Sequence, residues 1–374
     1  MNHFLKKFLV SSILCTSVAF AYDKKSIDKE QFVVNLDDPY AYFSRESDQT
    51  EFDRDFLVVY NTDKVVEGAL ISSTDYTQKH IGLPKELASK SVKIDQLVNI
   101  GYNNILVLVT NEKSNSNFAY IYSIEDLLNG DKKDKAIKLK LPNGYNPTIT
   151  YNNENWSNHI AQYFTYAVTS DKDKSSPVSA YLLQSKKIND EYQTFTQISE
   201  FQLPSDIDAE HIELATFSKP NPTPGHGYDF QSALVYKNAD LEFVQSCILT
   251  PGQFNNVTCG SIKNTNDFEN PAIASLMRNE NMALFANGVD KDNVYATTFN
   301  KNNLDTTNLS NIKNQGYNVD IAAIDTSPNF DGVTDRNYTI IETHRSKDNS
   351  VWANIYSYTD KNKEFSLEKS IVIE

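Results

Sequence analysis

One short stretch recurs along the chain, and a recurring stretch restricts the possible folds more than any other feature of a sequence. In each copy, a polar turn is followed by a strand-like run that carries a small residue among aromatic or apolar side chains. The small residues are Ala69, Ala119, Ala180, Ala296 and Ala353, with Val244 in the corresponding place of one copy. Neighbouring copies lie roughly 50 to 65 residues apart, a spacing typical of propeller blades.

Each copy contains more than one strand. In the second copy, an apolar run at residues 105–109 precedes the polar turn, and the strand at residues 118–123 follows it. Residues 92–94 and 137–141 flank this pair, and the second of these runs alternates apolar and basic residues as a half-buried strand does. Four strands in each of six copies predict an all-β fold, a six-bladed β-propeller with four antiparallel strands in each blade.

Two other architectures are alternatives. A seventh, degenerate blade would lie in residues 22–55 or in the long interval before Val244. A tandem of small β-sandwiches is disfavoured, because one copy is too short to form two packed sheets. Little helix is expected: residues 124–128 suggest a single turn, and residues 206–213 are ambiguous between helix and strand.

The N-terminus has the features of a targeting segment. Lys6 and Lys7 precede an apolar run at residues 8–18 that is too short to span a bilayer, and Ala19-Phe20-Ala21 matches a signal-peptide cleavage site. We therefore expect residues 1–21 to be a signal peptide cleaved near Ala21, with an uncleaved anchor as the alternative. Residues 22–50 are then an N-terminal segment that helps to close the propeller, and residues 51–374 form a single β-propeller domain.

Charge and composition narrow the range of partners. Loss of residues 1–21 removes two lysines and takes the formal net charge from −14 to −16. So acidic a protein is a poor candidate for binding nucleic acid or an anionic membrane surface. No later stretch is long and apolar enough to cross a membrane. The abundance of Lys, Asn, Asp and Ser is typical of an AT-rich bacterial genome, so we expect a periplasmic or secreted bacterial protein, and a monomer.

Two cysteines lie beyond the expected signal peptide, Cys247 and Cys259. In an oxidising compartment they are expected to form a disulfide. The residues between them are rich in turn formers, which predicts an antiparallel hairpin with the two cysteines on facing strands. A redox-active thiol pair is disfavoured, because the spacing is not that of a C-x-x-C motif.

Residues 325–335 are the strongest candidate for an ion site. The residues that could supply oxygen ligands are Asp325, Ser327, Asn329, Asp331 and Asp335. Carboxylate and amide oxygens at alternate positions around a glycine suit a hard cation such as Ca²⁺. The stretch therefore predicts a possible calcium site, and a solvated turn without an ion is the alternative.

This loop and its flanking strands at residues 321–325 and 338–341 resemble the Asp-rich calcium loop of FG-GAP/VCBS-type propeller repeats. The resemblance implies a β-propeller that binds calcium between the first and second strands of its last blade. It covers this blade, and the other copies agree with the family in strand layout alone. Ser327 stands where the repeat has its first aspartate, which puts a full ligand set in doubt.

Two other loops are candidates for ligand binding. Trp156 and His159 lie among polar neighbours, where an exposed indole can stack on a sugar ring. His226 and Tyr228 lie in a long connection stiffened by prolines, and such loops often carry binding residues. The alternatives are core packing for Trp156 and a plain surface turn around His226.

Catalytic signatures are missing from the sequence. It contains no H-E-x-x-H, no G-x-S-x-G and no glycine-rich phosphate loop. We therefore expect a non-enzymatic binding module for a glycan, a protein or a cell-envelope ligand. A polysaccharide-directed hydrolase or lyase is the alternative, because loops of different blades can assemble a site that sequence spacing does not reveal.

Overall fold

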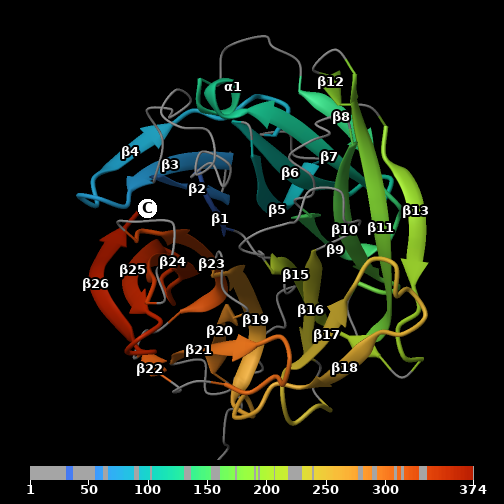
Figure 1. Cartoon of the computed structure of the whole chain (residues 1–374). Coiled ribbons are helices and arrows are strands. Elements are labelled where there is room, and N and C mark those ends of the chain that lie inside the picture. The colour runs from blue at the N-terminus through green and yellow to red at the C-terminus, as the bar shows by residue number, and fades with distance from the viewer. Residues whose placement is uncertain are drawn as a thin grey trace, which may run out of the picture.

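A computed structural model shows a ring of β-sheets around a central axis (Figure 1). The structure describes residues 31–36, 55–61, 66–87, 92–101, 103–129, 136–152, 161–172, 175–188, 191–192, 194–205, 207–217, 230–237, 240–276, 281–288, 293–306, 310–312, 316–327 and 335–373. Residues 1–30, including the expected signal peptide, lie outside this set.

Six antiparallel sheets follow one another in chain order, so the predicted six-bladed β-propeller is confirmed. Blade one is β1 (Gln31–Asn35), β2 (Asp55–Asn61), β3 (Val66–Ser72) and β4 (Gln78–Ile81). Blade two is β5 (Val92–Gly101), β6 (Asn104–Asn111), β7 (Ser116–Ser123) and β8 (Ile137–Lys140). Blade three is β9 (Tyr145–Asn152), β10 (Ala161–Thr169), β11 (Ser176–Ile188), β12 (Glu191–Tyr192), β13 (Thr196–Phe201) and β14 (Asp208–Ala209).

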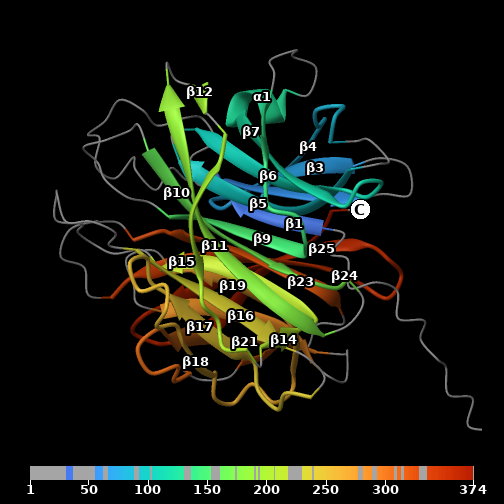
Figure 2. The same ribbon diagram turned by 90° about the vertical axis from the view of Figure 1, so that its right-hand side faces the viewer.

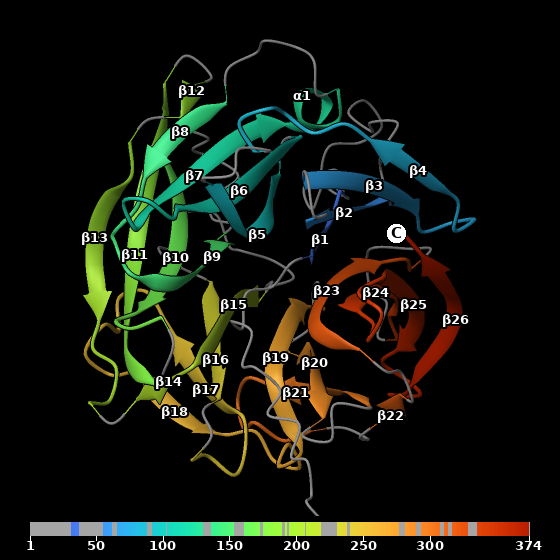
Figure 3. The same ribbon diagram turned by 180° about the vertical axis from the view of Figure 1, so that it is seen from behind.

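The remaining blades each have four strands. Blade four is β15 (His211–Phe217), β16 (Gln231–Lys237), β17 (Gln245–Leu249) and β18 (Thr258–Ser261). Blade five is β19 (Phe268–Ser275), β20 (Asn281–Gly288), β21 (Val294–Asn300) and β22 (Ser310–Ile312), and blade six is β23 (Tyr317–Asp325), β24 (Asn337–Arg345), β25 (Val351–Thr359) and β26 (Phe365–Val372). The first strand of each blade lies nearest the axis and the outermost strand lies at the rim, as Figures 1 and 3 show.

Blade three departs from the four-stranded plan. Its strand β11 has 13 residues and runs along the rim of the ring (Figure 2). This length lets it pair with β12 and β14 as well as with β10 and β13. The added strands lengthen the interval between Ala180 and Val244, so this part of the long interval does not hide a seventh blade.

Apolar side chains fill the spaces between neighbouring blades. Six buried clusters occur in the described residues, and each joins two adjacent blades. Ala119, Ala180, Ala296 and Ala353 each face the following blade, where a small side chain lets two sheets approach closely. Ala69 differs, because it faces blade six, which precedes blade one in the closed ring.

The innermost strands need partners for their unpaired edges, since a buried N–H without an acceptor is costly. Side chains of the preceding blade supply these acceptors. The Oε1 atom of Gln96 accepts from the N–H of Ile149 at 2.8 Å. The Thr148 hydroxyl accepts from the N–H of Leu214 at 3.0 Å. These contacts fix β5, β9 and β15 relative to one another around the channel.

The ring closes between β1 and β23 through a contact of the same kind. The Oδ2 atom of Asp320 accepts from the N–H of Val33 at 2.8 Å, and Asn35 Nδ2 donates to the carbonyl of Ala323 at 2.6 Å. Strand β1 pairs only with β2 of its own blade and is the innermost strand of that blade. The propeller therefore begins before residue 51, because residues 31–35 belong to blade one.

Replacing Asp320 by alanine should weaken this closure. The substitution leaves the buried N–H of Val33 without an acceptor, which costs about 1–3 kcal/mol of the free energy of unfolding. Asp320→Asn keeps an oxygen acceptor and should lose less. Urea unfolding followed by tryptophan fluorescence measures both variants, and an unchanged midpoint for Asp320→Ala would show that the contact does not close the ring.

Helix is scarce, as expected. The expected single turn is α1 (Ile124–Leu128), and the Ser123 hydroxyl caps it by accepting from the N–H of Asp126 at 3.0 Å. The ambiguous stretch at residues 206–213 contains β14 and the start of β15, because Ile212 and Leu214 face blade three as alternate residues of a strand do. No helix in the described part of the chain has the length and apolar character of a membrane span.

Candidate functional site at the mouth of the central channel

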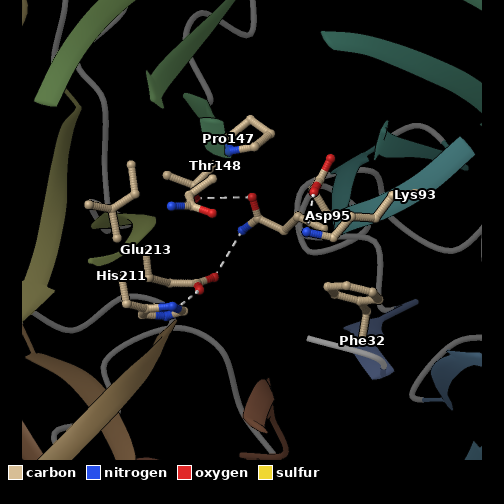
Figure 4. A pocket seen from close by; sticks show the side chains of 10 residues that line it. Phe32, Lys93, Asp95, Pro147, Thr148, His211 and Glu213 are labelled. Carbon is tan, nitrogen blue, oxygen red and sulfur yellow. Dashed lines mark hydrogen bonds and ion pairs between the residues drawn. The ribbon is translucent and has the colours of Figure 1, made fainter. Parts of the chain in front are cut away.

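A polar pocket lies where the innermost strands of blades one to four begin (Figure 4). We call it the channel-mouth pocket, and its lining residues are Phe32, Lys93, Asp95, Gln96, Asn146, Pro147, Thr148, His211, Ile212 and Glu213. Its volume is about 40 Å³, which is room for a few water molecules or for one small group of a larger ligand.

Irregular strand geometry shapes this end of the channel. The register of β5 against β6 shifts between Ile94 and Gln96, which makes Asp95 the extra residue of a β-bulge. Similar shifts occur near the start of β9, β19 and β23. Asn146 takes a left-handed backbone conformation with φ 46° at the shift in β9, which asparagine tolerates better than most residues. Such bulges re-aim side chains and are frequent beside functional sites.

His211 and Glu213 form one wall of the pocket. They are two residues apart on β15 and therefore point to the same side, with His211 Nε2 3.9 Å from Glu213 Oε2. His211 Nε2 also lies 3.0 Å from the carbonyl oxygen of Pro271. Because a carbonyl only accepts, Nε2 carries a proton, and Nδ1 is the basic nitrogen of the neutral ring.

Gln96 connects this wall to the other blades. Its Nε2 donates to Glu213 Oε1 at 3.1 Å, while its Oε1 accepts from the hydroxyl of Thr148 at 3.2 Å (Figure 4). The glutamine thus spans blades two, three and four with one side chain. An amide that is bonded at both ends holds Glu213 in a fixed position without neutralising its charge.

Asp95 and Lys93 form the opposite wall. Lys93 Nζ lies 3.4 Å from Asp95 Oδ1, and the Thr110 hydroxyl donates to Asp95 Oδ2 at 2.6 Å. Thr110 also lies 3.0 Å from Asn117 Oδ1, and Asn117 Nδ2 lies 2.8 Å from the Tyr166 hydroxyl. Burial raises the pKa of Tyr166 well above its usual value, so its hydroxyl stays neutral at physiological pH. The carboxylate of Asp95 is therefore held at the pocket by the interface between blades two and three.

The arrangement offers hydrogen-bond donors, acceptors and an apolar surface within one small space. Asp95 and Glu213 accept, Lys93 donates, and the ring of Phe32 borders the pocket beside them. Such a mixture suits a ligand that presents hydroxyl or amine groups next to an apolar face. His211 lies beside Glu213, and a second carboxylate, that of Asp95, lines the opposite wall, which meets the first structural requirement for acid–base chemistry.

The predicted calcium residues are partly described. The Asp325 carboxylate is buried and accepts from Arg336 Nη1 at 2.6 Å and from the N–H of Ser327 at 3.0 Å. The Ser327 hydroxyl accepts from the N–H of Asn337 at 3.0 Å, and Asp335 is exposed. Asn329 and Asp331 lie outside the described residues. Asp325 and Ser327 therefore stabilise the protein's own loop, and calcium binding stays a prediction.

The described residues contain no group of three or more His, Cys, Asp or Glu side chains that could hold a metal ion. This statement does not extend to residues 328–334 in the middle of the predicted calcium loop.

The predicted ligand-binding loops lie outside the part of the chain that the structure describes. Trp156, His159, His226 and Tyr228 all lie outside the described set. The described strands show where their loops are anchored: one joins the ends of β9 and β10, and the other joins β15 and β16. The pocket lies at the opposite ends of β9 and β15, so these loops are anchored at the far face of the propeller.

The predicted disulfide is present. Cys247 on β17 and Cys259 on β18 are paired in register and joined by an S–S bond of 2.07 Å. The bond ties the outermost strand of blade four to its sheet. It lies away from the channel, and its role is to stabilise the blade.

Sequence reasoning missed the main residues of the channel-mouth pocket. His211, Glu213 and Asp95 sit near the starts of innermost strands that otherwise read as apolar. The available signal was positional: polar residues recur at the start of the first strand in three consecutive blades. Sequence alone did not show this, because the start of β15 was ambiguous and the shifts in register leave no trace in composition.

Comparisons with known proteins identify no family for this chain. No family model matches the chain, and no curated protein matches it. A structure described as the Dos1 propeller is 10% identical, with a TM-score of 0.42, covering 92% of this chain and 74% of that one. A neuraminidase-like protein of subtype N11 from influenza A of a flat-faced bat is also 10% identical, with a TM-score of 0.44 and coverages of 89% and 88%.

TolB from Acinetobacter baumannii is a third similar structure, with 10% identity, a TM-score of 0.41 and coverages of 70% and 53%. These TM-scores are all below 0.5, and nothing is concluded from them about this chain. The six sheets support the resemblance to FG-GAP/VCBS repeats as far as the propeller fold, and no family model identifies that repeat in this chain.

Proposed function

We propose that the protein is an exported, non-enzymatic binding module that recognises a glycan through the channel-mouth pocket. The observation that carries this proposal is the convergence of Lys93, Asp95 and Glu213 from two innermost strands beside the ring of Phe32. Sugars present hydroxyl groups that both donate and accept, next to an apolar C–H face. The pocket matches the hydroxyl groups with charged donors and acceptors, while the Phe32 ring beside them is 1% exposed and belongs to the core between blades one and two.

The size of the pocket limits the mode of binding. About 40 Å³ admits one hydroxymethyl, hydroxyl or amine group. The rest of the ligand would then lie across the surface around the channel mouth. Because the pocket walls are held by hydrogen bonds between blades, little ordering is needed on binding, which favours affinity.

A glycan array with the purified protein tests this proposal. The expected result is binding to a set of glycans that share one terminal group, and loss of that binding in Glu213→Gln. Glu200→Gln, an exposed change on β13 at the rim, is the matched control. Absence of glycan binding, together with capture of a protein or lipid-linked ligand, would overturn the choice of glycan.

A polysaccharide hydrolase or lyase is the second candidate, and one observation favours it. His211 and the carboxylates of Glu213 and Asp95 line the same pocket, so a base and two acids are available. Incubation of a bound oligosaccharide with the protein, followed by mass spectrometry, separates the two functions. Intact ligand supports the binding module, whereas product that disappears in Glu213→Gln would establish the enzyme.

Calcium binding at residues 325–335 is a separate part of the proposal. If Ca²⁺ binds the native loop, a concentration of a hundred times its dissociation constant should add about 2.7 kcal/mol to the free energy of unfolding. Calorimetric melts in EGTA and in millimolar Ca²⁺ measure this difference, with Asp331→Ala as the variant that should lose it. Identical melts of the native protein in both buffers would remove calcium from the account of this loop.

A further inference from the structure

The interface between blades five and six contains a polar cluster distinct from the channel-mouth pocket. We call it the blade 5–6 cluster, and its residues are Asn287, Glu342, His344, Trp352, Asn354 and Tyr356. Alternate residues of a strand share a face. Tyr356 belongs to the apolar cluster between these blades, so Asn354 and Trp352 on β25 face blade five as well. Figure 1 shows β20 in blade five, and β24 and β25 in the neighbouring blade six.

Strands β24 and β20 supply the rest of the cluster by the same rule. Ile340 and Phe285 belong to the apolar cluster between the two blades. Glu342, two residues beyond Ile340, and Asn287, two residues beyond Phe285, therefore point into the same interface. The interface is thus polar where β20 and β24 end, and apolar nearer their starts.

Some members of the cluster bind one another directly. Glu342 Oε1 lies 2.7 Å from His344 Nδ1, and Glu342 Oε2 accepts from Asn354 Nδ2 at 2.6 Å. All three side chains are within 1% of complete burial. A carboxylate has about four lone-pair sites, so these two contacts leave Glu342 able to accept further hydrogen bonds.

Three other polar atoms of the cluster are buried and have no hydrogen-bond partner among the described residues. They are Asn287 Oδ1, Trp352 Nε1 and the hydroxyl of Tyr356. Burial, and to a lesser extent the charge of Glu342, raises the pKa of Tyr356, so its hydroxyl keeps its proton and can donate. Buried polar groups without a partner are rare in folded proteins, and ordered water is their commonest remaining partner.

The interface between blades two and three shows how similar residues behave when they meet directly. There, Asn117 Nδ2 lies 2.8 Å from the Tyr166 hydroxyl, which in turn donates to the carbonyl of Pro142 at 2.8 Å. An asparagine and a tyrosine thus join two blades without an intermediary. In the blade 5–6 cluster, Asn287 Nδ2 donates to the carbonyl of Gly316 at 2.6 Å, as Asn117 Nδ2 does to that of Gly144 at 3.0 Å. Asn287 Oδ1 and the Tyr356 hydroxyl, however, have no partner among the described residues, and a bridging molecule would satisfy them.

We propose that the blade 5–6 cluster is an internal water-binding site that joins the two blades. The indole N–H of Trp352 is a donor and disfavours a metal cation, while the Glu342 carboxylate disfavours an anion. The chemistry selects a small neutral molecule that both donates and accepts, which is water. Such a molecule can accept from the Trp352 indole or the Tyr356 hydroxyl and can donate to Asn287 Oδ1 or to a remaining lone pair of Glu342.

Nuclear magnetic resonance tests the site directly. The chain has two tryptophans, so in Trp156→Phe the only indole N–H signal belongs to Trp352. With ¹⁵N-labelled tryptophan, the expected result is a cross-peak between this N–H and the water frequency that has the sign of a long-lived contact. A Trp352 indole signal without a water cross-peak would overturn the proposal.

Tyrosine-to-phenylalanine substitutions give a second test. A hydroxyl held by water and a hydroxyl without a partner predict different changes in the melting temperature. If water holds the Tyr356 hydroxyl, Tyr356→Phe should lower the melting temperature by about 1–3 °C, in the same direction as the control Tyr166→Phe. If the hydroxyl has no partner, its removal should leave the melting temperature unchanged or raise it. An unchanged or raised value, with the control lowered, would contradict the water site.

Discussion

Replacing Arg336 by methionine should lower the free energy of unfolding by about 3–5 kcal/mol, because it leaves a buried carboxylate without its cationic partner. The Asp325 side chain is 1% exposed and lies 2.6 Å from Arg336 Nη1. Methionine fills part of the volume of arginine but offers no positive charge. The N–H of Ser327 also donates to Asp325, but it carries no charge that could neutralise the carboxylate. Chemical unfolding of both proteins measures the difference.

A double-mutant cycle separates the ion pair from simple packing. Asp325→Asn removes the charge while keeping the shape, so Arg336→Met should cost much less in its presence. A loss below about 1 kcal/mol for Arg336→Met alone is the value typical of an exposed ion pair. That outcome would contradict the view that this pair, rather than a bound ion, stabilises the base of the loop.

Reduction of the disulfide should lower stability by about 3 kcal/mol, since the bond closes the loop between Cys247 and Cys259, which are 12 positions apart in the sequence. The expected cause is the greater freedom of the unfolded chain when the loop is open. Urea unfolding in the presence and absence of a reductant measures the loss. The reduced native protein keeps both sulfur atoms, so the comparison isolates the cross-link from the packing of the buried Cys247 side chain.

The double substitution Cys247→Ala with Cys259→Ala provides the control for the disulfide. It should be less stable than the oxidised protein by at least the same amount and should not respond to reductant. Equal unfolding midpoints for the oxidised and reduced native protein would show that the hairpin of β17 and β18 is already fixed by its neighbours.

The architecture could be predicted from the sequence because its signals are local and repeated. A polar turn between two apolar strands recurs in every blade, and Ala119 or Ala353 marks the same packing position each time. The sequence could not predict that Ala69 faces blade six and not blade two, because a shift of one residue along a strand turns the side chain to the other face of the sheet. The added strands of blade three were also missed, since β12 and β14 are only two residues long.

The candidate site could not be predicted, for a different physical reason. Asp95, Thr148 and His211 are far apart in sequence, and only closure of the ring brings their strands together. A polar residue within a strand gives no sign in the sequence of which neighbours its side chain meets until the register of the strand is known. The sequence drew attention instead to the loops around Trp156 and His226, which are anchored at the opposite face of the propeller.

The most direct test of the channel-mouth pocket as the binding site compares variants at the two faces of the propeller. With a ligand identified on the array, calorimetric titration should show affinities about 10- to 100-fold lower for Glu213→Gln and Asp95→Asn, since each 1.4 kcal/mol of lost interaction is a factor of ten. Trp156→Ala and His226→Ala should bind as the native protein does. Unchanged affinity in the pocket variants, with loss of binding in the loop variants, would place the site at the opposite face and contradict the proposal.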